Sequence, residues 1–230
     1  RQNRLHVLAV QSRIYGYFWG TGDWSTMSNE GKVLLVTGGA HGIGAATAEL
    51  MSRRGYDVAT LDVLPEAEGE GVRRKVEANG RRCLYIPCDV ADEEQVKRAV
   101  VQRTLETPGT VNVFVNNAGI VRRVGIEEDI FLDSVQDQFS VNALGSARMV
   151  KALLPQLRET RGRIVNIGSI ASFNATTGGI GYGLSKGGVL LMTKTMAAEL
   201  AQYGIRVNGI APGIIITPMT EPTRNNAGVA

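Results

Sequence analysis

The stretch Val33–Gly44 constrains the fold of this chain most, because it joins a short apolar run to a helical pattern through a glycine-rich turn. The run Val33–Thr37 has the β-branched and apolar composition of a buried strand. Gly38, Gly42 and Gly44 follow it and lead into the helical pattern. Glycine turns sharply and lets the backbone approach a ligand, and a helix start presents free N–H groups to phosphate. The pattern favours a dinucleotide-binding turn over a flexible loop.

Short apolar runs alternate with longer helical patterns as far as residue 220, which predicts βαβ units and a parallel sheet. Right-handed crossovers then give an α/β, doubly wound, Rossmann-like sheet whose ligands bind outside the carboxyl ends of the strands. The expected strands are Val33–Thr37, Asp57–Asp62, Cys83–Pro87, Val111–Asn116, Gly162–Ile167 and Ile205–Ile210. The expected helices are Gly42–Arg54, Pro65–Ala78, Asp92–Glu106, Leu132–Glu159, which is long enough to contain a break, and Gly181–Tyr203.

Composition narrows the class of protein. With 230 residues, 43% of them hydrophobic, the chain can form one domain with a substantial core, expected over residues 30–230. Lysine and arginine outnumber the acids only by 25 to 22 and form no basic block, so nucleic acid is not an expected partner. Cys83 and Cys88 form no metal-ligand pattern with His6 and His41. We expect reduced thiols, no metal and a cytoplasmic protein.

Residues 1–29 differ from the rest and are expected to lie outside the fold. They contain both tryptophans, Trp19 and Trp24, which suits a docking or membrane-surface arm. The apolar run Leu5–Val10 is too short for a signal peptide or a membrane span. Because Met27 directly precedes the first clear strand region, we favour Met27 as the natural start of the protein.

Asp62 ends the second expected strand, 18 residues after Gly44 (62 − 44). A carboxylate there can accept hydrogen bonds from ribose hydroxyls and would repel a 2′-phosphate. Position 63 is valine and position 41 is histidine, so no permanent cation is available to bind that phosphate. The alternative is a solvated acid at a strand end, but the position favours NAD over NADP.

Tyr182 and Lys186 are four residues apart near the start of an expected helix, so both side chains lie on one face. A cation beside a phenol stabilises the phenolate and lowers the pKa of the tyrosine, which would suit a proton shuttle. Ser169 follows the fifth expected strand at the same edge of the sheet and can hydrogen-bond a substrate oxygen. Alone, the pair would more often be ordinary helix surface, and the serine a turn former.

Together these residues resemble the classical short-chain dehydrogenase/reductase family from about Gly31 to Thr217. The motifs are Thr-Gly-x-x-x-Gly-Ile-Gly at 37–44, Asn-Asn-Ala-Gly at 116–119, Tyr-x-x-x-Lys at 182–186 and Pro-Gly at 212–213. The resemblance implies strand order 3-2-1-4-5-6, a small alcohol or carbonyl substrate, and a homo-oligomer, either a dimer or a tetramer. It also implies an enzyme that interconverts a secondary alcohol and a ketone, or reduces a 3-oxoacyl-type carbonyl, with NAD(P).

The resemblance assigns roles to individual residues. Tyr182 would be the acid/base, Lys186 would lower its pKa and bind the nicotinamide ribose, Ser169 would orient the substrate, and Asn142 would support a proton path. From the residues alone, Asn142 would be a buried structural amide. The implied cofactor-binding residues are Gly38, His41, Gly42, Ile43, Gly44, Asp62, Asp89, Val90, Asn116, Ala118, Gly119, Tyr182, Lys186, Pro212, Gly213 and Thr217. Substrate contacts are expected from residues 120–122, 171–180 and 219 onward.

The C-terminal end departs from the family pattern. A substrate-covering segment, a further helix and a seventh strand are expected after the Pro-Gly loop, but the sequence ends at Ala230. We therefore expect a C-terminally truncated domain whose sixth strand is an exposed edge. Two alternatives to an active enzyme follow: a non-catalytic NAD(P)-binding scaffold or redox sensor, and an inactive fragment.

Overall fold

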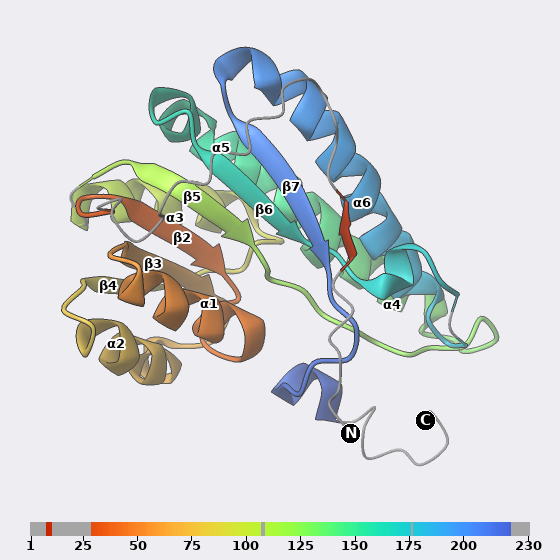
Figure 1. Cartoon of the computed structure of the whole chain (residues 1–230). Helices are drawn as coiled ribbons and strands as arrows, with labels where there is room; N and C mark the ends of the chain where they lie inside the picture. The colour runs from red at the N-terminus through yellow and green to blue at the C-terminus, as the bar shows by residue number, and fades with distance from the viewer. Residues whose placement is uncertain (1–7, 11–28, 107–108, 176, 222–230) are drawn as a thin grey trace, which may run out of the picture.

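The computed structural model describes residues 8–10, 29–106, 109–175 and 177–221 (Figure 1). The aromatic part of the N-terminal stretch, Met27, Thr176 and the segment 222–230 lie outside the described residues. In the described part of the chain, no helix has the length and apolar character needed to cross a membrane.

A parallel sheet forms the centre of the molecule, in the order β4-β3-β2-β5-β6-β7 (Figure 1). With the parallel strands numbered in chain order, this is 3-2-1-4-5-6, which confirms the doubly wound topology that the resemblance implied. Each strand lies within one residue of its prediction. The strands are β2 (Val33–Thr37), β3 (Asp57–Asp62), β4 (Cys83–Pro87), β5 (Val111–Asn116), β6 (Arg163–Ile167) and β7 (Arg206–Ala211).

Helices cover both faces of this sheet. Side chains of a strand alternate between the two faces, so these largely apolar strands present apolar side chains on both, and each face must be buried. Leu34 and Val36 of β2 belong to a core cluster shared with α1 and α2, whereas Leu35 belongs to the cluster shared with α3, α5 and α6. The helices are α1 (Gly42–Arg53), α2 (Glu70–Glu77), α3 (Glu93–Glu106), α4 (Phe131–Phe139), α5 (Ser146–Glu159) and α6 (Ile180–Leu200).

The long helix expected over Leu132–Glu159 changes from α-helical to π-helical geometry partway along, but the chain stays helical throughout. A π-helical turn, Ser140–Gly145, joins α4 to α5 without an intervening loop. Such a turn adds a residue to the helical repeat and often occurs at a functional site. Asn142 lies within it and is 1% exposed.

The outer edge of β7 is not open along its whole length, contrary to expectation. Strand β1 (Leu8–Val10) pairs antiparallel with β7, with Leu8 opposite Ala211 and Val10 opposite Gly209. Three residues of the N-terminal stretch therefore belong to the sheet, although we expected the whole stretch to lie outside the fold. Backbone pairing at this position satisfies N–H and C=O groups that an edge strand leaves free.

Candidate active site

The glycine turn after β2 brings the backbone of α1 against the end of the strand. Gly38 has a positive φ of 66° and donates its N–H to Leu61 O at 2.7 Å, so the turn is tied to β3. A Cβ on Gly44 would lie 2.0 Å from Gly38 O, which no side chain could occupy. The helix start can approach the strand this closely only because both positions are glycine.

Asn117 and Thr37 fix this turn to the end of β5. Thr37 Oγ1 accepts the N–H groups of Asn117 and Ala118, both at 3.0 Å. The Asn117 side-chain amide donates to Thr37 O at 2.9 Å and Gly38 O at 3.1 Å. Thr37 and Asn117 belong to the expected motifs, but the sequence indicated no role for either side chain. The signal that could have indicated a contact between them is their position: Thr37 ends β2, and Asn117 follows the neighbouring strand β5.

The Asp62 carboxylate is held by two backbone amides at the end of β3. One oxygen accepts the N–H of Ala40 at 3.0 Å, and the other accepts the N–H of Leu64 at 3.2 Å. The carboxylate therefore has a fixed orientation beside the glycine turn. His41, in the same turn, faces Glu68 at 3.6 Å.

A cavity of about 550 Å³ runs along the carboxyl ends of the strands, a volume that suits a bound small molecule or cofactor. It extends from Asp62 and the glycine turn to Tyr182 and Lys186. Most of the expected site residues lie in its wall. They are Gly38, His41, Gly42, Ile43, Asp62, Asp89, Val90, Ala118, Gly119, Ser169, Tyr182, Lys186, Pro212, Gly213 and Thr217.

The remaining expected residues, Gly44, Asn116 and Asn142, do not line the cavity. Asn116 donates to Ser146 O and Asn166 Oδ1, both at 3.2 Å, so its side chain is part of a buried network under the site. Gly44 acts through helix packing, as described above.

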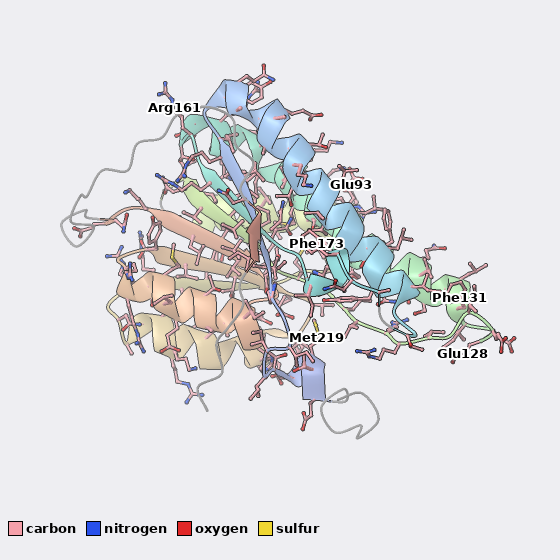
Figure 2. All side chains as sticks on the ribbon, turned by 45° about the vertical axis from the view of Figure 1, so that its right-hand side comes forward. Glu93, Glu128, Phe131, Arg161, Phe173 and Met219 are labelled. Carbon is pink, nitrogen blue, oxygen red and sulfur yellow. The ribbon has the colours of Figure 1, made fainter. Side chains whose placement is uncertain are left out.

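The substrate side of the cavity matches expectation only partly. Ile120, Arg122 and Met219 line it as expected, but none of the described residues of 171–180 (171–175 and 177–180) does. Figure 2 labels one residue of each segment: Met219, which lines the cavity, and Phe173, which does not. Further lining residues in the described chain were not expected from the sequence: Leu61, Val63, Leu64, Cys88, Val141, Ile167, Gly168 and Pro218.

Ser169, Tyr182 and Lys186 come together from two elements. Ser169 follows β6 and accepts the N–H of Ala171 at 3.1 Å, which fixes its side chain. Tyr182 and Lys186 lie in the first two turns of α6, and Lys186 Nζ lies 5.9 Å from the centroid of the Tyr182 ring. Lys186 Nζ donates to Ile167 O at 2.8 Å and has two further N–H donors.

Burial controls the pKa values of both ionisable groups. It raises the pKa of the Tyr182 phenol, and the hydrogen bond with Ser169 opposes this rise. It lowers the pKa of the Lys186 ammonium to about 8. The sequence predicted that Lys186 would lower the pKa of Tyr182. In this structure the hydrogen bond with Ser169 lowers that pKa, and desolvation exceeds it.

Asn142 joins the walls of the site through its backbone partners. Its Oδ1 accepts the N–H of Ile120 at 2.7 Å, and its Nδ2 donates to Ile120 O and to Ser185 Oγ, both at 2.9 Å. Ser185 Oγ in turn donates to Tyr182 O at 2.8 Å. The amide thus connects the segment after Gly119 with the turn that carries Tyr182.

The cavity wall fits a dinucleotide. Several glycines line it, and a Cβ on Gly119 would lie 3.0 Å from Asn142 Oδ1 and 3.5 Å from Lys186 Nζ. A side chain here would fill the space in front of the ammonium. The glycine turn and helix start offer N–H groups at one end, and the ammonium offers donors at the other.

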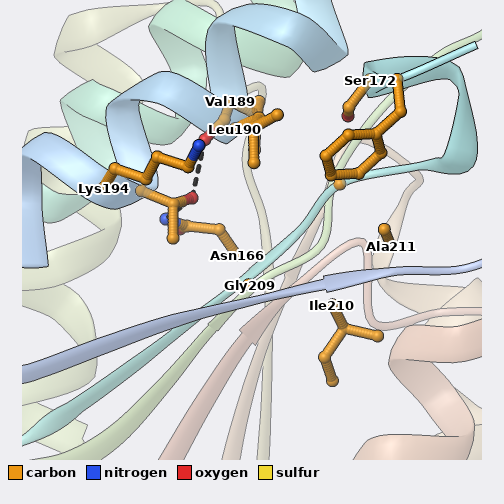
Figure 3. A pocket seen from close by; sticks show the side chains of 11 residues that line it. Asn166, Ser172, Val189, Leu190, Lys194, Gly209, Ile210 and Ala211 are labelled. Atoms are coloured by element: carbon orange, nitrogen blue, oxygen red, sulfur yellow. Dashed lines mark hydrogen bonds between the residues drawn. The ribbon is translucent and has the colours of Figure 1, made fainter. Parts of the chain in front are cut away.

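A second cavity, of only about 20 Å³, lies between α6 and β7 (Figure 3). It is lined by Asn166, Val189, Leu190 and Ile210, among others, and is large enough for about one water molecule. None of the proposed catalytic side chains lines this second cavity.

Comparisons with known proteins agree with this geometry. The family described as short chain dehydrogenase matches residues 32–228. An L-fucose dehydrogenase of Bos taurus is 36% identical over 191 residues, which cover 83% of this chain and 68% of the relative. A 3-oxoacyl-[acyl-carrier-protein] reductase of Thermotoga maritima is 39% identical over 206 residues, covering 85% and 78%.

Solved structures give the same result. An NAD⁺-bound xylitol dehydrogenase superimposes with a TM-score of 0.75 at 34% identity, covering 80% of this chain and 70% of that one. The chain spans 66% to 78% of the length of the curated relatives it matches. On the family match, the sheet order and the cavity together, the chain belongs to the classical short-chain dehydrogenase/reductase family of NAD(P)-binding oxidoreductases.

Proposed function

We propose that this chain interconverts a secondary alcohol and a ketone, or reduces a 3-oxoacyl-type carbonyl, with Tyr182 as the acid/base. The observation that carries the proposal is that Ser169, Tyr182 and the buried Lys186 ammonium line one cavity. Relatives named for L-fucose, xylitol and 3-oxoacyl groups support a substrate with a hydroxyl or carbonyl group. Bound NAD(P) supplies hydride chemistry.

The chain's own residues then hold the substrate and move its proton. Ser169 Oγ and the Tyr182 hydroxyl both contact the substrate oxygen and fix it for transfer. In reduction, the phenol gives its proton to the developing alkoxide. A raised pKa keeps that phenol protonated at neutral pH, which suits this direction. In oxidation, the phenolate accepts the hydroxyl proton.

Lys186 and Asn142 support this proton transfer. The two free donors of the Lys186 ammonium lie beside the space in front of Gly119, where they can bind a ribose hydroxyl and stabilise the phenolate. Asn142 holds Ile120 and, through Ser185, the backbone of Tyr182. Its proposed part in a proton path rests on the family resemblance.

The test is Tyr182→Phe, which removes only the hydroxyl. With sugars, polyols and 3-oxoacyl thioesters as substrates, we expect kcat/KM to fall about 10³-fold while NAD(H) affinity stays within about twofold. Tyr203→Phe is the matched control, because Tyr203 stacks on Arg158 at 3.6 Å and does not line the cavity. Turnover that survives in Tyr182→Phe would disprove the assigned role and favour another proton donor.

We further propose that NAD is preferred over NADP. The Asp62 carboxylate, oriented by the N–H groups of Ala40 and Leu64, would accept ribose hydroxyls and repel a 2′-phosphate. We expect kcat/KM to be about 100-fold higher with NAD, and Asp62→Asn to reduce that ratio. An equal or reversed preference in the unmodified protein would contradict the assignment.

We expect a small-molecule substrate and a homo-oligomer, as the family suggests. We also propose that the protein is cytoplasmic.

A further inference from the structure

We infer that Gln138 of α4 is a positioning residue that holds the substrate-side segment 120–122 against the turn carrying Tyr182. The inference rests on the proposed function, because it concerns the geometry of the same site. Gln138 was not among the residues that the sequence pointed to, and it does not line the cavity itself.

Gln138 is 1% exposed, and each end of its amide has a partner. Its Oε1 accepts the backbone N–H of Arg122 at 2.9 Å. Its Nε2 donates to Ser134 O and Ser134 Oγ, both at 3.2 Å. A buried amide costs free energy unless its hydrogen bonds are made, so these bonds fix the rotamer. The fixed oxygen in turn fixes the position of the Arg122 backbone.

Gln138 and Asn142 act on the same segment from one side. They are four residues apart along α4 and the π-helical turn, so both amides face residues 120–122. Asn142 binds the N–H and C=O of Ile120, and Gln138 binds the N–H of Arg122. The segment between them has no regular secondary structure, so side-chain amides take the part that a strand ladder would otherwise play.

Gln138 also touches the other wall of the site. A Cβ on Gly181 would lie 2.5 Å from Gln138 Nε2 and 3.2 Å from the Cα of Val135. Gly181 is buried and directly precedes Tyr182 in the first turn of α6. The first turn of α6 therefore packs directly on the Gln138 amide, and this side chain, together with Asn142, sets the distance between segment 120–122 and Tyr182.

This distance matters because Ile120 and Arg122 line the same cavity as Ser169 and Tyr182. A displacement of about 1 Å between a substrate and its acid/base can lower the rate by about 10²-fold. An apolar side chain of similar volume could fill the space of Gln138, but it could not hold the Arg122 N–H.

The first experiment is Gln138→Met, which keeps most of the volume and removes both polar ends. Two readouts are measured: steady-state kinetics with NAD(H), and amide hydrogen exchange of residues 119–124 in the protein without cofactor. We expect kcat/KM for the alcohol or ketone to fall about tenfold or more, KM for NAD(H) to change less than about twofold, and exchange in 119–124 to rise about tenfold.

Gln156→Met is the matched control. Gln156 Oε1 also accepts a backbone N–H, that of Val111 at 3.3 Å, and a bond from Arg103 at 2.9 Å, but at the amino end of β5. The substitution Gln156→Met therefore removes a side-chain amide that also holds a backbone N–H but does not line the cavity. We expect it to lower stability without changing the exchange of 119–124 or kcat/KM.

Gln138→Glu is the rescue variant, because it keeps an oxygen acceptor for the Arg122 N–H. It should retain more protection in 119–124 than Gln138→Met. If Gln138→Met does not fold, Gln138→Asn provides the same test by withdrawing the amide by one methylene. A folded Gln138→Met or Gln138→Asn protein with unmodified exchange in 119–124, or with kcat/KM within about twofold, overturns the inference.

The exchange measurement also separates this inference from the proposed function. If Tyr182→Phe retains turnover, the proton-transfer assignment fails, but exchange in residues 119–124 still reports whether Gln138 holds that segment. If Tyr182→Phe loses turnover and Gln138→Met changes nothing, only the positioning role fails.

Discussion

Asp57 and Lys186 are both buried ionisable side chains, but the protein surrounds them in opposite ways. Asp57 is the first residue of β3, at the amino end of the sheet, and is 1% exposed. Arg81 and Arg82, just before β4, both form ion pairs with its carboxylate. Burial by itself raises the pKa of Asp57, but the hydrogen bonds and charges of the two arginines outweigh it and hold the pKa below its usual value.

Lys186 lies at the carboxyl end of the same sheet and is 4% exposed. Its ammonium donates a hydrogen bond to a neutral oxygen, Ile167 O, at 2.8 Å. Desolvation is therefore not offset by a carboxylate, and it lowers the pKa of the ammonium to about 8. A partly satisfied buried cation costs stability, whereas a paired buried anion need not.

The difference separates a structural charge from one that is available for chemistry. Arg81 Nε and Arg82 Nε both donate to the Asp57 carboxylate, so these groups form an internal ion pair, and none of the three residues lines the cavity. Lys186 keeps two N–H donors beside the cavity. A protein that retains such a group against its cost in stability does so where function requires it.

The largest effect should come from Lys186→Met, which removes the unpaired charge. We expect kcat/KM to fall about 10³-fold, because the variant loses both the ribose donor and the cation that stabilises the phenolate. Steady-state kinetics with a saturating alcohol and NAD measures this. The control is Lys194→Met, which removes an exposed ammonium two turns further along α6. If Lys186→Met kept more than about a tenth of the activity, Lys186 would be a structural charge like Asp57.

Asp57→Asn should have the second-largest effect, and on stability. It leaves two arginines without their carboxylate, and we expect the free energy of unfolding at pH 7 to fall by about 2–3 kcal/mol. The loss should disappear as the pH falls through the lowered pKa of Asp57, because the unmodified carboxyl is then protonated too. Urea unfolding at pH 7 and at successively lower pH values below 3.8, the usual pKa of the group, follows this loss.

The matched control for Asp57→Asn is Asp129→Asn, at an exposed loop position, which should change stability by less than about 0.5 kcal/mol. Activity should persist in both variants, since neither residue lines the cavity. A loss of turnover in folded Asp57→Asn would mean that the two ends of the sheet are coupled.

The sequence predicted the strands of the sheet better than it predicted the tertiary contacts around buried side chains such as Asp57 and Lys186. Strand positions follow from apolar, β-branched runs, and the helix that begins after Asp92 follows from its cap: Asp92 Oδ1 accepts the N–H groups of Glu94 and Gln95. The Tyr182–Lys186 pair was visible because helical spacing alone puts both residues on one face.

Tertiary contacts were invisible for a physical reason. Gln138 looks like a solvent-facing polar residue until the backbone of Arg122, 16 residues away, is folded against it. The π-helical turn at Ser140–Gly145 accompanies a bond from Asn142 to Ile120, 22 residues away. Strand β1 depends on a partner, β7, about 200 residues later, and its sequence carries no signal for that register.

The smallest predicted effect is the gain in stability from Lys186→Met, and its pH dependence tests the comparison most directly. At pH 7 the ammonium is protonated in both the folded and the unfolded protein, so the cost of burying it is fully present. Removing it should raise the free energy of unfolding by about 1–2 kcal/mol, after allowance for the lost bond to Ile167 O.

That gain should shrink as the pH rises. Between the folded pKa of about 8 and the unfolded value of 10.5, the folded lysine has released its proton and the unfolded lysine has not. The unfolded state then binds more protons, so the unmodified protein becomes more stable relative to the variant as the pH increases. Chemical denaturation of both proteins at pH 7, 8.5 and 10 gives the curve, with Lys194→Met as control. A difference that stays constant from pH 7 to pH 10 would mean that Lys186 is solvated or paired in solution, and the contrast with Asp57 would be lost.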